Sequence, residues 1–241
     1  MWPHWAAELF ADEGTFAYYR QFVGVGYQPE APSSWSQKPF ELKVRAVCKS
    51  CNNGWMSDLE TTAKDTLFGS AFSGHRRVLS RGGQRTLAAW ALKTAMMAEH
   101  TNARSRRGMP RVEYEHLWEH LEPSAKARIW LASYAGTNVV ALALPFGIDV
   151  GSDRLPARER GERNVWGTTI LFGPVVFQIL GSDVPKVLDV FDLAAPNTHQ
   201  IWPYRRRFTW TPHPGLDDRG VMQLHDQYLA RLKGLIERKE R

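Results

Sequence analysis

The stretch TLAAWALKTAMMAEHT, from Thr86 to Thr101, gives the strongest helical pattern in the chain and decides the fold. It is made mostly of good helix formers. Leu87, Ala91 and Ala95 recur at helical spacing and form one apolar face. A helix with so many small and apolar residues is typical of a protein core, so we expect the rest of the chain to pack around it.

The segments after this helix change from helical to strand periodicity near residue 127. ARIWLASYA and NVVALALPF, within residues 127–146, are separated by a Gly-Thr pair and predict a β-hairpin. A second pair of strands is predicted over residues 168–181, across a Gly-Pro turn. Further helices are expected at residues 112–121, 184–193 and 221–240. The mixture predicts an α+β protein with antiparallel strands.

The part of the chain before this helix predicts a small unit of its own, residues 1–70, ahead of a larger body, residues 71–241. A short helix is expected at residues 2–10. Strands are expected at residues 15–27 and 40–47, with a loop at residues 28–39 between them. RGGQ, residues 81–84, is expected to interrupt the chain just before the core helix.

Length and composition allow one large core or two smaller ones in a chain of 241 residues. The hydrophobic fraction of 43% and the charged fraction of 23% are close to globular averages and exclude a disordered or fibrous chain. The formal net charge of +6 makes an anionic partner such as nucleic acid plausible. Charge alone decides nothing, because many proteins this basic never bind DNA.

The cellular compartment can be predicted from two further features of the sequence. No run reaches the roughly 18 apolar residues of a membrane helix, and the N-terminus MWPHWAAELF lacks the pattern of a signal peptide. We therefore expect a cytoplasmic protein. The chain has two cysteines, and in a reducing compartment such a pair favours a metal over a disulfide.

Both cysteines belong to VCKSCNNGWMSDLE, from Val47 to Glu60. Thiolates two residues apart can bind one Zn²⁺ together, but a closed structural site needs four ligands. His75 and His100 do not offer the paired spacing that would complete such a site, so the alternative of two thiols in a turn without metal stays open. Ser57 and Glu60 have the spacing of a capping box, which predicts that a helix begins there.

CNNGWMSDLE, preceded by strands and followed by a helix, resembles a bacterial and phage group of HNH endonucleases, the ββα-metal nucleases. In that group the second C-x-x-C of a zinc knuckle is followed at once by the same string. MWPHW resembles the segment that follows the catalytic histidine of the group. The resemblance covers roughly the first hundred residues, and it implies metal-dependent hydrolysis of DNA phosphodiester bonds.

The resemblance also implies roles for individual residues. Asn52 and Asn53 correspond to the helix start that supplies or orients a ligand of the catalytic Mg²⁺ or Mn²⁺. Cys48 and Cys51 correspond to half of the structural Zn²⁺ site. The histidine base, its acidic neighbour and the first C-x-x-C would precede Met1 on this alignment.

Three explanations of that alignment stay open: a start codon assigned too far downstream, a decayed nuclease, or His4 acting as the base. His4 lies about one helical turn beyond the required position, so we expect little or no cleavage by this chain. The alternatives are a non-catalytic nucleic-acid-binding or interaction protein on the same scaffold, or a structural protein with a fortuitous CNNG turn.

Basic segments interleaved with aromatic residues are the predicted DNA-binding surfaces. The strongest surrounds Arg205, Arg206 and Arg207, which lie among Trp202, Tyr204 and Trp210. The others are residues 75–77 and residues 104–111, the latter containing Arg104, Arg106 and Arg107. A solvated charged face is the alternative for each segment. Three other tryptophans, Trp55, Trp90 and Trp130, are expected in the core. The expected partners are DNA and a second copy of the chain.

Overall fold

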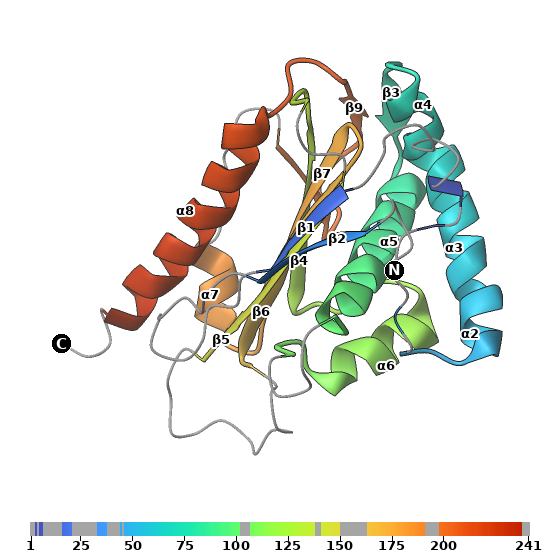
Figure 1. Cartoon of the computed structure of the whole chain (residues 1–241). Helices are drawn as coiled ribbons and strands as arrows, with labels where there is room; N and C mark the ends of the chain where they lie inside the picture. The colour runs from blue at the N-terminus through green and yellow to red at the C-terminus, as the bar shows by residue number, and fades with distance from the viewer. Residues whose placement is uncertain are drawn as a thin grey trace.

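The structure is a computed structural model, and it describes residues 3, 5–6, 16–20, 33–37, 44, 46–101, 107–137, 141–149, 163–190 and 198–237. A five-stranded antiparallel sheet lies between two layers of helices (Figure 1). The layer on one side contains α3, α5 and α6, and the layer on the other contains α7 and α8. The predicted α+β class with antiparallel strands is confirmed.

The central sheet has the strand order β5-β6-β7-β4-β8. Its strands are β4 (Ala127–Ser133), β5 (Ala141–Ile148), β6 (Val165–Phe172), β7 (Val175–Ser182) and β8 (His199–Trp202). The predicted strand pair across Gly173 and Pro174 is confirmed as the β6–β7 hairpin. Gly173 has φ of +52°, a left-handed conformation that glycine adopts without steric cost.

The hairpin predicted between residues 127–135 and 138–146 is wrong. β4 pairs with β7 and β8, whereas β5 pairs with β6 at the edge of the sheet. Periodicity predicts where strands are but not which strands pair. A strand with apolar residues on both faces, such as β4, gains most from a place inside the sheet, where both faces are covered.

The two faces of the sheet contribute to two separate apolar clusters. Ile129 and Leu131 of β4 face the layer of α5, together with Phe172 and Phe177. Trp130, next to them in β4, faces the layer of α7 (Pro185–Val190) and α8 (Asp218–Glu237). The alternation follows from the two-residue period of a strand. The helices predicted at residues 184–193 and 221–240 are confirmed where the structure describes them.

The core helix α5 (Arg81–Glu99) is confirmed and longer than predicted. Its N-cap is Ser80, whose hydroxyl accepts a hydrogen bond from the Gly83 N–H, so RGGQ forms the first turn instead of a break. A Cβ atom on Gly83 would lie 3.1 Å from the Thr66 side chain, which explains a glycine inside this turn. Trp90, at the middle of the helix, is fully buried.

A second helical stretch runs antiparallel to α5. It consists of α3 (Trp55–Ala63), η1 (Lys64–Phe68) and α4 (Gly69–Phe72). Glu60 forms an ion pair with Lys93 in the second half of α5, and Thr66 packs against Gly83 at its beginning. Residues before Glu60 therefore lie toward the end of α5, where α6 (Arg111–His120) follows (Figure 1).

Two small sheets complete the described elements. β1 (Phe16–Arg20) pairs antiparallel with β2 (Ser33–Gln37), and β3 (Arg77–Leu79) pairs antiparallel with β9 (Phe208–Trp210). β1 lies inside its predicted strand, but β2 lies in the stretch predicted as a loop. Of the strand predicted at residues 40–47, the described residues 44, 46 and 47 are not in a strand. Of the helix predicted at residues 2–10, Trp5 and Ala6 are helical, Pro3 is not, and the other residues lie outside the described ones.

One apolar cluster joins the N-terminal stretch to the body, because Met56 and Ala63 pack in the same core as Leu87 and Ile129. The predicted core positions hold for Trp90 and Trp130, which are buried, and Trp55 is half-buried. Among the described helices, none combines the length and the apolar character needed to span a bilayer.

Candidate metal and nucleic-acid sites

The cysteine motif forms the start of a helix. Cys48 is the N-cap of α2 (Lys49–Asn53), and its Sγ accepts a hydrogen bond from the Cys51 N–H at 3.4 Å. The capping box predicted at Ser57 and Glu60 is wrong, because α3 begins at Trp55 with Gly54 as its N-cap, so Ser57 lies inside the helix. The thiol takes the part that an N-cap hydroxyl usually plays, so the helix start also fixes the position of Cys48.

Gly54 separates α2 from α3 and explains the glycine in CNNG. A Cβ atom there would lie 2.8 Å from the Ser50 carbonyl oxygen, closer than side chains approach. The Gly54 N–H donates to that same oxygen at 2.9 Å. Any larger residue would push the two helices apart and disturb the position of Asn52 and Asn53.

The two thiols differ in their electrostatic environment. The Ser50 hydroxyl and the Cys51 N–H both stabilise the Cys48 thiolate, and they lower the pKa of Cys48 to about 7. The hydrogen bond to Cys48 and partial burial raise the pKa of Cys51. Both cysteines are free thiols, and Cys48 is exposed. At pH 7 about half of the Cys48 side chains are thus thiolates, the form that binds a cation.

Asn52 and Asn53 are exposed on the same turn. The Asn52 side-chain amide donates a hydrogen bond to Oδ1 of Asn53 at 3.0 Å, so the two side chains lie together. Their amide oxygens are the kind of hard ligand that Mg²⁺ and Mn²⁺ accept. Within the described residues, no group of three or more His, Cys, Asp or Glu side chains is arranged to hold a metal ion. His4 lies outside the described residues.

Two of the predicted basic segments are linked by a strand pair, but their charged residues lie at its opposite ends. β3 pairs with β9 in the register Arg77↔Trp210 and Leu79↔Phe208, so residues 75–77 lie away from Arg205, Arg206 and Arg207, which precede β9 at its other end. These three arginines are exposed. Arg77 has a structural role, since its guanidinium donates hydrogen bonds to the carbonyl oxygens of Asp65 and Thr66. The three exposed arginines after Tyr204 therefore form a charged segment separate from residues 75–77.

The third basic segment lies elsewhere. Arg107 is half-buried near the end of α5, close to Glu99 and His100, and its Nε atom is buried without a hydrogen-bond partner. The Glu99 carboxylate accepts from the N–H groups of Gly108 and Met109 at 3.1 Å. This end of α5 is therefore a folded polar turn in which Arg107 is partly enclosed. Arg104 and Arg106 lie outside the described residues.

A cavity of about 590 Å³, which the sequence did not predict, lies at the start of α5. It is lined by Arg81 and Arg85 of the helix and by Trp202, Pro203 and Tyr204 of the segment that follows β8. The arginines stand four residues apart at a capped helix start, and that spacing could have predicted that they share one face. Their position opposite the aromatic segment depends on sheet topology, which no local pattern predicts.

The walls of the cavity are held by polar contacts. Arg85 forms an ion pair with Glu122 at 2.9 Å and also donates to the His120 carbonyl oxygen at 2.9 Å. The Trp202 indole N–H donates to the Ser124 carbonyl oxygen at 2.9 Å. These contacts fix both walls to the chain that joins α6 to β4.

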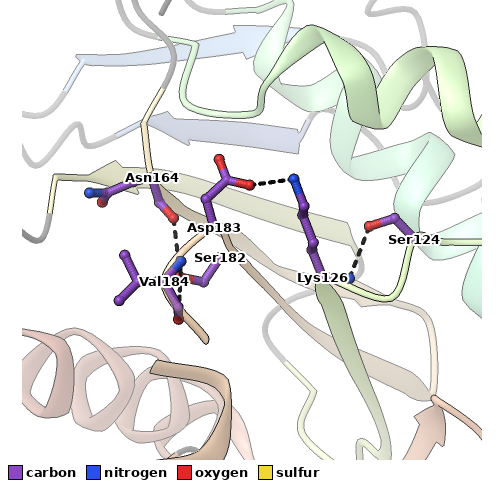
Figure 2. A network of polar contacts seen from close by, with 6 residues as sticks. All are labelled: Ser124, Lys126, Asn164, Ser182, Asp183 and Val184. Carbon is purple, nitrogen blue, oxygen red and sulfur yellow. Dashed lines mark hydrogen bonds and ion pairs between the residues drawn. The ribbon is translucent and has the colours of Figure 1, made fainter. Parts of the chain in front are cut away.

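That connecting chain is itself anchored to the sheet, as Figure 2 shows. Lys126 forms an ion pair with Asp183 at 2.7 Å, and its N–H donates to the Ser124 hydroxyl at 3.1 Å. The Ser182 hydroxyl donates to the Asn164 carbonyl oxygen at 3.1 Å. The network ties the segment beside Trp202 to the ends of β6 and β7, so this wall of the cavity is rigidly placed.

The comparisons with known proteins found no match among family models, curated proteins or solved structures. The two candidate sites are therefore judged by their own chemistry. The cysteine motif offers thiolates and amide oxygens to a cation, whereas the cavity offers guanidinium groups and aromatic rings to an anion that carries a flat group.

Proposed function

We propose that this chain acts on DNA as a member of the HNH-type endonucleases, with the Cys48–Asn53 segment as its metal-binding corner. One observation carries the proposal: the segment forms an exposed helix start in which a thiol of pKa about 7 and two amide side chains lie on adjacent turns. An antiparallel strand pair, β1–β2, precedes it in the chain, which is the element order of a ββα unit.

The residues present fit part of each metal site of that group. Cys48 and Cys51 suit two of the four positions around Zn²⁺. The amide oxygens of Asn52 and Asn53 suit Mg²⁺ or Mn²⁺, which would stabilise the charge on the phosphate during hydrolysis. His4 would stand about one helical turn beyond the position of the base, so we expect little or no cleavage.

The nuclease proposal is tested by nicking of supercoiled plasmid in the presence of Mn²⁺ or Mg²⁺. Any nicking should be slow and metal-dependent, and Asn52→Ala/Asn53→Ala should lower it at least about tenfold, because metal-assisted stabilisation of the transition state is lost. Gln227→Ala, an exposed amide on α8, is the matched control and should nick like the unmodified chain. Nicking at an equal rate in the double asparagine variant contradicts the proposal.

A second candidate function is nucleic-acid binding without cleavage. It is favoured by the exposed residues Arg205, Arg206 and Arg207, which directly follow Tyr204, and by the exposed Arg81, whose guanidinium lies over the Tyr204 ring. Binding to plasmid fragments that weakens steeply with salt, in the absence of nicking, would select this function, because counterions are released when phosphates are neutralised. Failure to bind any DNA at low salt would contradict both candidates.

The zinc half-site implies a partner that supplies two further ligands. A second copy of this chain supplies two thiolates of the same geometry, so we expect Zn²⁺ to bind at one ion per two chains and to form a dimer. Sedimentation with Zn²⁺ and after chelation measures this. Cys48→Ser/Cys51→Ser should stay monomeric in both conditions, and a dimer that forms equally in that variant would refute the shared site.

A further inference from the structure

We infer that the cavity at the start of α5 binds one unpaired nucleotide of single-stranded DNA, an inference that rests on the proposed action on DNA. The cavity combines two kinds of group that the nucleotide needs. Tyr204 and Trp202 present aromatic surface for a base, and Arg81 and Arg85 present guanidinium groups for a phosphate. Its volume of about 590 Å³ is within the range of sites that enclose small ligands.

The charged and aromatic groups face the same space. The Arg81 guanidinium lies over the Tyr204 ring, 5.9 Å from its centroid, so a bound nucleotide can touch both at once. Arg85 is held in place by Glu122, which also neutralises part of its charge. Arg81 is exposed and is therefore the better candidate to bind the phosphate.

The segment that carries the aromatic residues is fixed against the helix. Gln84 is fully buried, and its side-chain amide donates to the carbonyl oxygens of Leu79 and Arg206, each at 2.9 Å. This contact holds the chain just after Tyr204 against the first turn of α5. The cavity is thus formed before any ligand arrives, which lowers the entropic cost of binding.

A strand of nucleic acid fits the surroundings better than a free nucleotide. Arg205, Arg206 and Arg207 follow Tyr204 directly and are exposed, so positive charge continues outside the cavity. The phosphates of neighbouring nucleotides can bind these arginines. A base in a duplex is stacked between its neighbours and cannot enter a cavity, so the strand must be unpaired at this point.

The test is binding of fluorescein-labelled (dT)8 to the full chain, followed by fluorescence polarisation. Tyr204→Ala should weaken binding about 5- to 100-fold, since stacking of one base on an aromatic side chain is lost. Arg81→Ala should weaken it about tenfold, since a charge-assisted hydrogen bond is lost. Arg219→Ala, an exposed arginine on α8, is the matched control and should bind within twofold of the unmodified chain.

A second measurement locates the bound strand independently of protein stability. In an octamer with a single 5-iododeoxyuridine, irradiation should crosslink the base to Tyr204 or Trp202, as read by mass spectrometry of the peptides. Unlabelled duplex of the same sequence should compete at least tenfold more weakly than the single strand. Circular dichroism and thermal melting of each variant show that it is folded.

Three outcomes overturn the inference. The first is single-strand binding that is unchanged in both variants, and the second is a crosslink to residues outside the cavity. The third is free thymidine monophosphate binding as tightly as (dT)8. If duplex DNA is bound or nicked normally while these results are found, only the cavity assignment fails. If no DNA of any form is bound, the proposed function fails with it.

Discussion

The two ends of helix α5 differ in what they offer to a ligand. The helix has 19 residues, so its ends lie about 28 Å apart. The end near α2 and α6 (Figure 1) carries the exposed Cys48 thiol and the half-buried Cys51 thiol together with exposed amides, which suit a cation. The end at Arg81 carries guanidinium groups and aromatic rings around a cavity, which suit an anion. One rigid helix thus connects two surfaces of opposite preference, and a nucleic acid that contacts both would cover about eight base pairs.

Removal of the ion pair that joins α3 to α5 should lower the stability of the fold more than any other change, because this contact lies between the two ends of α5. Glu60→Ala leaves the buried Lys93 without its ion-pair partner, and we expect a loss of about 3 to 5 kcal/mol in the free energy of unfolding. Urea denaturation measures this. Lys93→Met removes the charge with little change in volume and should be near neutral, and Glu119→Ala is an exposed control. A loss below about 1 kcal/mol in Glu60→Ala would contradict the expected cost of an unpaired buried charge.

The next largest effect is a pH-dependent change in stability, and it comes from Glu99 at the end of α5 near the thiols. Burial raises the pKa of Glu99 from 4.5 to about 7 in the folded chain. Below pH 4.5 the carboxyl group is protonated in both the folded and the unfolded chain. As the pH rises to about 7, the unfolded chain releases this proton first, so the contribution of Glu99 to stability is lost.

Glu99→Gln removes that titration while keeping an oxygen for the Gly108 and Met109 N–H groups. Between pH 4.5 and 7 we expect the variant to gain about 2 to 3 kcal/mol relative to the unmodified chain. Urea denaturation at several pH values measures the difference. For Glu115→Gln, on the exposed side of α6, the curve of unfolding free energy against pH should run parallel to that of the unmodified chain. A parallel curve for Glu99→Gln would refute the raised pKa of Glu99.

A smaller effect concerns the thiol itself. Ser50→Ala removes the hydroxyl that stabilises the Cys48 thiolate, so the pKa of Cys48 should rise from about 7 toward that of an ordinary thiol. The pH dependence of alkylation by iodoacetamide, read for Cys48 by peptide mass spectrometry, gives the midpoint. Ser57→Ala is the matched control. An unchanged midpoint in Ser50→Ala would assign the low pKa to the helix start alone.

The smallest expected effect concerns the salt dependence of DNA binding at the Arg81 end of α5. Arg207→Ala should lower the salt dependence of single-strand binding by about 0.7 in the slope of log K against log salt, the amount expected for one phosphate contact. Polarisation at four salt concentrations measures the slope. Alkylation of Cys48 should not change in this variant. A slope equal to that of the unmodified chain would remove Arg207 from the binding surface.

The sequence predicted the elements of this fold better than their arrangement. The core helix, the β6–β7 hairpin and the C-terminal helix follow from periodicity and turn residues, which are local. The pairing of β4 with β7 and β8 is decided by contacts between residues far apart in the chain, which periodicity does not contain. The helix starts were missed for a related reason: Ser80 and Cys48 cap helices whose first turns contain weak helix formers.

In the candidate sites, too, local features could be predicted from the sequence and long-range contacts could not. The cysteine motif is local, so its residues could be named from the sequence, although the cap and the lowered pKa of Cys48 could not. The cavity is assembled from α5 and the segment after β8, more than a hundred residues apart. Of its lining residues, Trp202 and Tyr204 were singled out as aromatic neighbours of arginines, whereas Arg81 and Arg85 were not.

The position of β4 determines the order in which the chain can fold. β4 emerges from the ribosome before either of its neighbours, because β7 and β8 lie some fifty and seventy residues later in the chain. The β6–β7 hairpin can close locally, but the sheet is complete only after residue 202 has been synthesised. Closing such long loops costs entropy before the contacts are made, so folding should be slow. During translation the apolar strand β4 is therefore unpaired until β7 and β8 are synthesised, and chaperone binding would protect it from aggregation.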